Sequence, residues 1–195
     1  MRAPPAETND SCMTSADISS QQLGVPAPGR YRIDPEHSTV TIRTRHLFGL
    51  GPVRATLALR DGRIQVGVSP AASTVQARFA ASTFRSRNPA RDAAVLSPRL
   101  LDAEAYPSLS FTSTELVQAA GQAEGQWSLR GELEVRGVTR LVEARISAVE
   151  ADSATLRASA QVSIDRYDFG ITAYRGLAAR GLTVDLSIIA RREIA

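Results

Sequence analysis

The chain has 195 residues, a length that favours one domain with a sizeable hydrophobic core, and its 43% hydrophobic content excludes disorder throughout. The net charge is +3, with all the basic residues arginine. These arginines alternate with apolar residues instead of forming a basic stripe, so we expect no nucleic-acid partner.

Residues 1–29 are predicted to be a disordered N-terminal extension, and residues 30–195 the folded domain. The extension is rich in Pro, Ser, Ala, Asn and Gln and contains no apolar run. Cys12, the only cysteine, lies in it and is expected to be an exposed, idle thiol; one cysteine excludes an internal disulfide. The segment lacks the apolar core of a signal peptide, and no other segment reaches membrane-spanning length. We therefore expect a cytoplasmic protein without a membrane span.

The first half of the domain alternates between apolar and polar residues with period two, which predicts β-strands. The expected strands cover residues 31–34, 38–46, 53–59, 64–68 and 75–81. Asp34-Pro35 is expected to form a turn. Asp61-Gly62 is a favoured pair for a two-residue hairpin turn, so we expect one between the third and fourth strands.

Residues 88–105 break this period and predict a short helical excursion. Asn88 can cap a helix, and Pro89 suits its first position because proline has no backbone donor to lose. Residues 91–96 favour helix, and Pro98 limits it. A second short turn is expected over residues 100–105. We expect the excursion to pack over one end of a closed sheet, with Arg91 and Asp92 as a structural pair.

The second half returns to alternation, with strands expected over residues 108–117, 127–135, 141–149, 154–164 and 182–190. Turns are expected at Gly137-Val138-Thr139 and at Asp152-Ser153. About eight to ten strands at hairpin spacing indicate an antiparallel sandwich or barrel, and closing a barrel removes the sheet edges.

Alanine is frequent on the predicted inward face of this sheet. A barrel of about eight strands either fills its interior with side chains or holds one small ligand. Small inward residues favour an open apolar tunnel, and the alternative is that bulky neighbours fill the space. The alanines concerned are Ala55, Ala77, Ala81, Ala144, Ala154, Ala158 and Ala160.

Four motifs, in order along about residues 30–193, resemble the YceI-like family of lipocalin-type, polyisoprenoid-binding proteins. They are Tyr31-x-Ile33-Asp34-Pro35-x-His37-Ser38; Asn88-Pro89-x-Arg91-Asp92 with Tyr106-Pro107-x-Leu109-x-Phe111-x-Ser113; Arg136-Gly137-Val138-Thr139-Arg140; and Ile164-Asp165-Arg166-x-Asp168-Phe169-Gly170-Ile171. The resemblance implies a bacterial protein with an all-β, antiparallel, lipocalin-like barrel of about eight strands. The resemblance also implies that many relatives are exported.

The resemblance further implies that an apolar tunnel binds a long isoprenoid chain, such as a polyprenyl phosphate or a quinone, without turnover. Burial of the tail would contribute about 0.8 kcal/mol per methylene. Alternation assigns fourteen residues to the tunnel wall. They are Val40, Ile42, Phe79, Phe111, Leu129, Leu133, Leu156, Ala158, Ala160, Val162, Ile164, Phe169, Leu186 and Ile188.

A polar head group would need donors at the rim of the barrel. Arg85 and Arg87 flank the start of the helical excursion and could bind a phosphate through paired donors. The alternative is that they are solvated surface charges. His37 follows a proline turn and is a further candidate for a hydrogen bond at the barrel mouth.

Other functions find less support in the sequence. His37 and His46 lack metal-ligand spacing and a third ligand, so neither a metal nor a cofactor is expected. Asp165, Arg166 and Asp168 are interpreted as a charged turn in which Arg166 offsets the two acids. A hydrolase or isomerase of a small hydrophobic substrate would use His37 and Asp168. A solid barrel that binds a protein partner is a third alternative, and a homodimer is left open.

Overall fold

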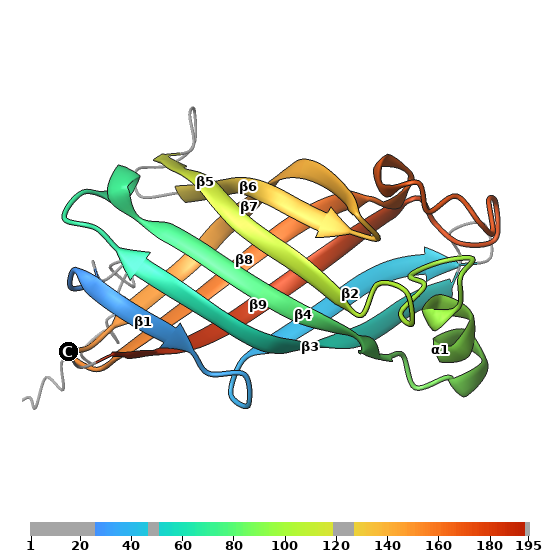
Figure 1. Cartoon of the computed structure of the whole chain (residues 1–195), viewed down its shortest axis with the longest axis horizontal. Coiled ribbons are helices and arrows are strands. Elements are labelled where there is room, and N and C mark those ends of the chain that lie inside the picture. The colour runs from blue at the N-terminus through green and yellow to red at the C-terminus, as the bar shows by residue number, and fades with distance from the viewer. Residues whose placement is uncertain (1–25, 47–50, 119–126, 194–195) are drawn as a thin grey trace, which may run out of the picture.

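The computed structural model describes residues 26–46, 51–118 and 127–193, and in these ranges the chain forms a closed antiparallel β-barrel with one α-helix (Figure 1). The predicted fold class is confirmed. The elements are β1 (Gly29–Ile33), β2 (Thr39–His46), β3 (Gly51–Val66), η1 (Pro70–Ala72), β4 (Thr74–Arg85), α1 (Pro89–Leu96), β5 (Ser108–Gln118), β6 (Trp127–Val135), β7 (Val138–Ala151), β8 (Thr155–Asp165), η2 (Arg166–Phe169) and β9 (Gly181–Arg192).

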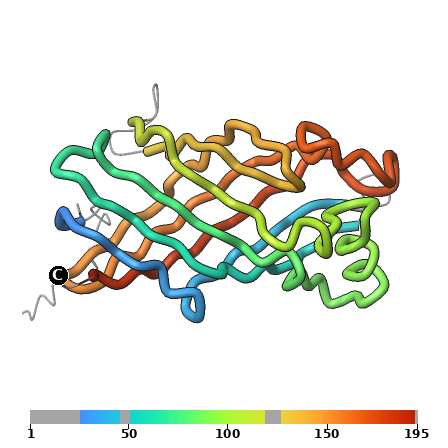
Figure 2. The backbone as a smooth tube through the Cα atoms, in the orientation of Figure 1, coloured from blue at the N-terminus to red at the C-terminus, as the bar shows by residue number. Residues whose placement is uncertain are grey.

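The described strands follow the order β1-β3-β2-β9-β8-β7-β6-β5-β4, and the pairing of β3 with β4 closes the barrel. Both β1 and β2 run antiparallel to β3 and to β9, at different heights of those two long strands. The strands β1 and β2 therefore lie end to end between β3 and β9, and a loop separates them at the middle of the barrel. Figure 2 shows this loop leaving the wall between the two blue segments.

The break between β1 and β2 is held by two polar side chains. The Asp34 carboxylate accepts hydrogen bonds from the backbone N–H groups of Glu36 and His37, as expected for a turn. The buried hydroxyl of Ser38 accepts from Ile189 N at 3.0 Å and donates to Ile189 O at 3.3 Å. The Ser38 side chain thus takes the place of a backbone hydrogen-bonding partner for Ile189 of β9 where the neighbouring strand is interrupted.

The barrel has two distinct ends. The α1 end carries the helical excursion of residues 86–107, the turn between β6 and β7, and the long connection of residues 166–180 (Figure 1). The opposite η1 end carries residues 67–73 with η1, the turn between β7 and β8, and residues 26–28.

The helix α1 begins and stops as its sequence predicts. The Asn88 side chain accepts a hydrogen bond from Arg91 N at 3.0 Å, and Pro89 occupies the first helical position. The helix ends at Leu96, and residues 98–105 continue as turns. Val95 and Leu96 pack against the buried core next to β4, so the excursion covers one end of the barrel.

The predicted hairpin at Asp61-Gly62 is wrong, because β3 runs through both residues as one strand. The pairing with β4 shifts register between Leu59 and Asp61, so the pair forms a bulge instead of a turn. Glycine is needed at position 62, where a Cβ atom would lie 2.6 Å from Ile33 Cδ1 and 2.9 Å from Gln76 O.

The turn between β6 and β7 lies earlier than predicted. Arg136 and Gly137 form it, with φ of 53° and 72°, and Val135 pairs with Val138 across it. Positive φ at both central residues is typical of a two-residue hairpin turn that matches the strand twist. Val138 and Thr139 therefore already belong to β7. The turn predicted at Asp152-Ser153 is found, and the Asp152 carboxylate accepts from the N–H groups of Ala154 and Thr155.

The described residues begin inside the predicted N-terminal extension. Most of the predicted extension, residues 1–25 with Cys12, lies outside the described residues. Residues 26–29, however, contact the barrel. The hydroxyl of fully buried Tyr31 donates to Ala27 O at 2.8 Å, and Arg192 donates to Pro28 O at 2.9 Å. Gly29 already pairs with Val66 as the first residue of β1.

Candidate ligand-binding cavity

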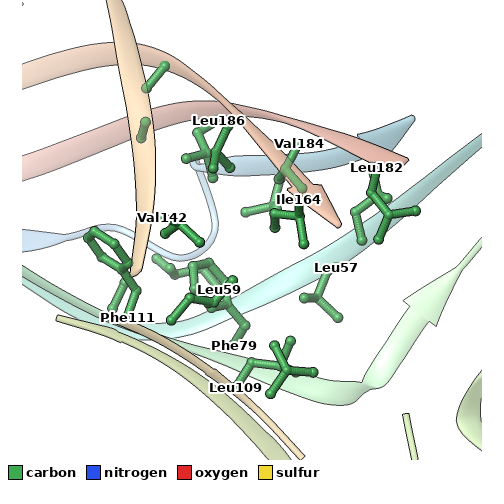
Figure 3. A pocket seen from close by; sticks show the side chains of 18 of the residues that line it. Leu57, Leu59, Phe79, Leu109, Phe111, Val142, Ile164, Leu182, Val184 and Leu186 are labelled. Carbon is green, nitrogen blue, oxygen red and sulfur yellow. The ribbon is translucent and has the colours of Figure 1, made fainter. Parts of the chain in front are cut away.

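The barrel encloses a cavity of about 790 Å³ whose lining residues come from both ends and from the strands between them. This volume lies within the range of small-molecule sites, roughly 300–1,000 Å³. Figure 3 shows aliphatic and aromatic side chains reaching into it from opposite walls, among them Leu57 from β3, Phe111 from β5 and Val184 from β9. The interior is an apolar cavity and not a solid core.

All fourteen residues that alternation assigned to the tunnel line this cavity. Of the seven inward alanines predicted from the sequence, five line it as well: Ala55, Ala77, Ala144, Ala158 and Ala160. Ala81 and Ala154 do not belong to the lining. That these residues bind a ligand stays a prediction; their position around the cavity is what the structure shows.

Further lining residues were missed because bulges reverse the parity of three strands. The register between β4 and β3 shifts between Thr56 and Ala58 of β3. After this shift Phe84 lines the cavity, and Ala81, which was expected to line it, does not. In β7 the shift between Ile146 and Ala148 brings in Val149. In β5 the shift between Ser113 and Glu115 brings in Leu116. In the sequence, a bulge could have been recognised only from a short polar pair or a run of Ser and Thr inside a strand.

Gly131 makes room for one of the aromatic side chains of the wall. A Cβ atom at this position would lie 2.6 Å from two ring atoms of Phe111 and 2.5 Å from Thr112 O. The ring of Phe111 therefore lies directly over the β6 backbone, and the glycine decides how far it extends into the cavity.

Most polar residues of the lining lie at the α1 end, and Ser73 lies at the η1 end. Those at the α1 end are Thr44, Arg45, Arg91, Arg166 and Tyr174. Arg166 is the most buried of these, with 6% of its surface exposed. Its guanidinium donates to four backbone carbonyls in the 166–180 connection, those of Ile171, Ala173, Ala178 and Ala179, at 2.7–3.1 Å. The Arg166 side chain thus organises the loop that borders the mouth.

This role of Arg166 corrects the interpretation of Asp165, Arg166 and Asp168 as a turn in which the arginine offsets the acids. The Asp165 carboxylate instead pairs with Arg180 and accepts from Tyr167 N. Arg91 and Asp92 likewise form no direct ion pair. Arg91 Nε donates to Ser86 Oγ at 2.7 Å, and that hydroxyl donates to Asp92 Oδ1 at 2.6 Å. The two charged residues are connected through Ser86.

The three residues predicted for a head group lie outside the cavity lining. His37 is not at a mouth, because its loop leaves the wall at mid-height; its ring Nδ1 lies 3.0 Å from Asp34 Oδ2 and its side chain is 58% exposed. Arg85 is exposed at the end of β4 and donates to Ser82 O and Phe84 O. Arg87 is exposed at a positive φ of 61°.

Residues with acid–base or metal-binding chemistry are not found together around the cavity. The described lining contains no His, Cys, Asp or Glu. Among the described residues, no cluster of three or more potential metal ligands occurs. His37 lies in the loop between β1 and β2, and Asp168 lies in η2 at the α1 end, so the structure does not bring together the pair that the enzymatic alternative requires.

The barrel and its interior define a lipocalin-like β-barrel with an apolar cavity. A family model described as the YceI-like domain matches residues 31–190, and the chain belongs to this family. A search of curated proteins found no significant match. In the described part of the chain, no helix has the length and apolarity needed to cross a bilayer.

Solved structures share the fold at low sequence identity. BcnA from Burkholderia cenocepacia is 19% identical, with a TM-score of 0.67 over 80% of this chain and 98% of that one. A polyisoprenoid-binding domain from Saccharophagus degradans is 11% identical, with a TM-score of 0.61 over 84% and 98%. A YceI protein from Campylobacter jejuni is 14% identical, with a TM-score of 0.52 over 98% and 100%. At these identities the likeness concerns the fold.

Proposed function

We propose that the protein binds a long-chain isoprenoid-type lipid, such as a polyprenyl phosphate or a quinone, inside the barrel and carries it without chemical change. The observation that carries this proposal is the apolar cavity, whose lining extends from the α1 end to the η1 end. A long, linear chain of isoprene units with short methyl branches suits such an elongated apolar space, and each buried methylene would contribute about 0.8 kcal/mol.

Membership of the YceI-like family supports a lipid ligand, since one structural relative is described as a polyisoprenoid-binding domain. The composition of the lining supports binding without turnover. General acid–base and nucleophilic catalysis use His, Asp, Glu or Cys side chains in most enzymes, and none of these lines the described cavity.

The substitution Ala158→Phe tests the proposal directly. Ala158 lies on β8, borders the cavity and is only partly buried against the core cluster of β1 and β3. A phenylalanine ring would extend into open space, so the free energy of unfolding should change little. Binding of a long-chain isoprenoid should fall at least tenfold, because the ring occupies the path of the tail.

The matched control is Ser163→Phe on the same strand, which adds the same ring to an exposed, outward position. It should leave the affinity unchanged. Fluorescence titration with a polyprenyl ligand and urea denaturation supply the two readouts. Unchanged affinity in Ala158→Phe, together with a loss of about 1–3 kcal/mol from overpacking, would contradict the proposal and place any ligand outside the barrel.

A further inference from the structure

Charge is distributed very unevenly along the cavity. Only three of the described lining residues are charged, and all three are arginines: Arg45, Arg91 and Arg166. All lie at the α1 end. The lining at the η1 end is uncharged and includes Pro26, Val68, Pro70, Ser73 and Val75. One end of the apolar cavity therefore carries positive charge and the other carries none.

The charge of Arg166 is fixed in place and lacks a contacting carboxylate. Its hydrogen bonds all go to backbone carbonyl oxygens, its guanidinium also lies over the Tyr167 ring, and no salt bridge among the described residues includes it. Burial lowers the pKa of its guanidinium, but an arginine side chain stays protonated in proteins. A buried cation next to a low-dielectric cavity attracts an anion more strongly than a solvated one would.

Arg91 has donors available for direct contact. Its Nε and Nη2 donate to Ser86 Oγ and Ser86 O, while Nη1 has no partner among the described residues. The side chain is held in position by Ser86 and by the helix α1 on which it lies. A guanidinium fixed in this way can offer its remaining N–H groups to the oxygens of a phosphate. Arg45 adds a third positive charge at the same mouth.

We infer that the bound lipid carries an anionic head group of the phosphate type at the α1 end, in contact with Arg91 and within the field of Arg166, with its tail directed toward the η1 end. This inference rests on the proposed function and deepens it, because it chooses the polyprenyl phosphate over the neutral quinone. It also fixes the orientation of the ligand. The head group lies on the side of α1 that faces the cavity and not at Arg85 and Arg87.

The experiment compares three ligands of equal tail length on the full chain: a polyprenyl monophosphate, the corresponding polyprenol and a quinone. The monophosphate should bind at least tenfold more tightly than the two neutral compounds. Raising the salt concentration should weaken the binding of the phosphate and leave the polyprenol unaffected, because salt screens the charges of exposed Arg45 and half-buried Arg91, although it screens buried Arg166 less. Equal affinities for all three would overturn the inference while the proposed function stands. Failure of all three to bind would overturn the proposed function itself.

Variants locate the head group. Arg91→Gln should lower the affinity for the monophosphate about tenfold and leave the polyprenol unchanged, and Arg91→Lys should recover part of the loss. The matched control is the double variant Arg85→Gln/Arg87→Gln, which removes two exposed arginines near the same end and should bind the monophosphate normally. If the double variant loses the preference for phosphate and Arg91→Gln keeps it, the head group lies outside the cavity and the inference is wrong.

Discussion

Gly131 and Phe111 show how single residues shape the interior of this barrel. The Cβ atom of an alanine at position 131 would lie 2.6 Å from the Phe111 ring and 2.5 Å from Thr112 O. Both distances are shorter than a van der Waals contact. Gly131→Ala should therefore destabilise the fold by about 1–3 kcal/mol through overpacking. Gly181→Ala on β9, where no atom lies within 4 Å of the added Cβ, is the matched control. Equal urea midpoints for both variants would contradict this packing.

Asp34 gives the fold a component of acid sensitivity. Its hydrogen bond with His37, and further ones with Arg191 and backbone N–H groups, lower its pKa from 3.8 to about 2 against the opposing effect of desolvation. Because the pKa is lower in the folded state, this stabilisation is complete above about pH 4 and is lost as the pH falls through about 2.

Asp34→Asn should accordingly lower the melting temperature at pH 5 and make little difference near pH 2. Thermal unfolding followed by circular dichroism at both pH values provides the measurement. A difference between variant and parent that is the same at pH 5 and pH 2 would show that the carboxylate charge does not contribute and that only the turn geometry matters.

At the scale of elements, regular strands and the capped helix could be predicted from the sequence, and irregularities within strands could not. Period-two alternation identified the fourteen cavity residues because it depends only on which face of a strand is buried. A bulge adds one residue and reverses that parity, and its signal is local and weak. Phe84, Leu116 and Val149 were missed for this reason.

The arginines at the α1 end of the cavity could not be predicted from the sequence, for a different reason. Arg166 looked like a member of a charged turn because Asp165 and Asp168 are its neighbours in sequence. Its actual partners are carbonyl groups brought close by the path of the 166–180 connection. Likewise, His37 was expected at a mouth because hairpin turns usually lie at barrel ends, whereas β1 and β2 share one wall position.

The N-terminal segment divides into two parts with different expected effects. Deleting residues 1–25 should leave the melting temperature within a few degrees, since the sequence there lacks apolar periodicity. Deleting residues 1–28 also removes Ala27 O, the acceptor of the buried Tyr31 hydroxyl, and Pro28 O, the acceptor of Arg192. An unsatisfied buried donor costs about 1–3 kcal/mol, so this second truncation should melt lower. Equal melting temperatures for the two truncations would contradict a structural role for residues 26–28.

At the scale of the whole molecule, the fold combines a continuous wall with an interior that side chains do not fill. Inward alanines on β3, β4, β7 and β8 leave the space, and closure of the barrel pairs the strand edges that an open sheet would expose. A protein built in this way gains apolar contacts when a lipid tail enters. Ligand binding should therefore stabilise the folded state by RT ln(1 + L/Kd), where L is the free ligand concentration, so the free energy of unfolding should rise with the logarithm of the ligand concentration.

Native mass spectrometry of the gently purified full chain is the most direct test of the claim that the barrel carries a lipid. We expect a species heavier than the polypeptide by the mass of one isoprenoid-type lipid, which should be absent in Ala158→Phe and present in Ser163→Phe. A barrel that arrives empty and takes up no polyprenyl phosphate, polyprenol or quinone when these are added would contradict it.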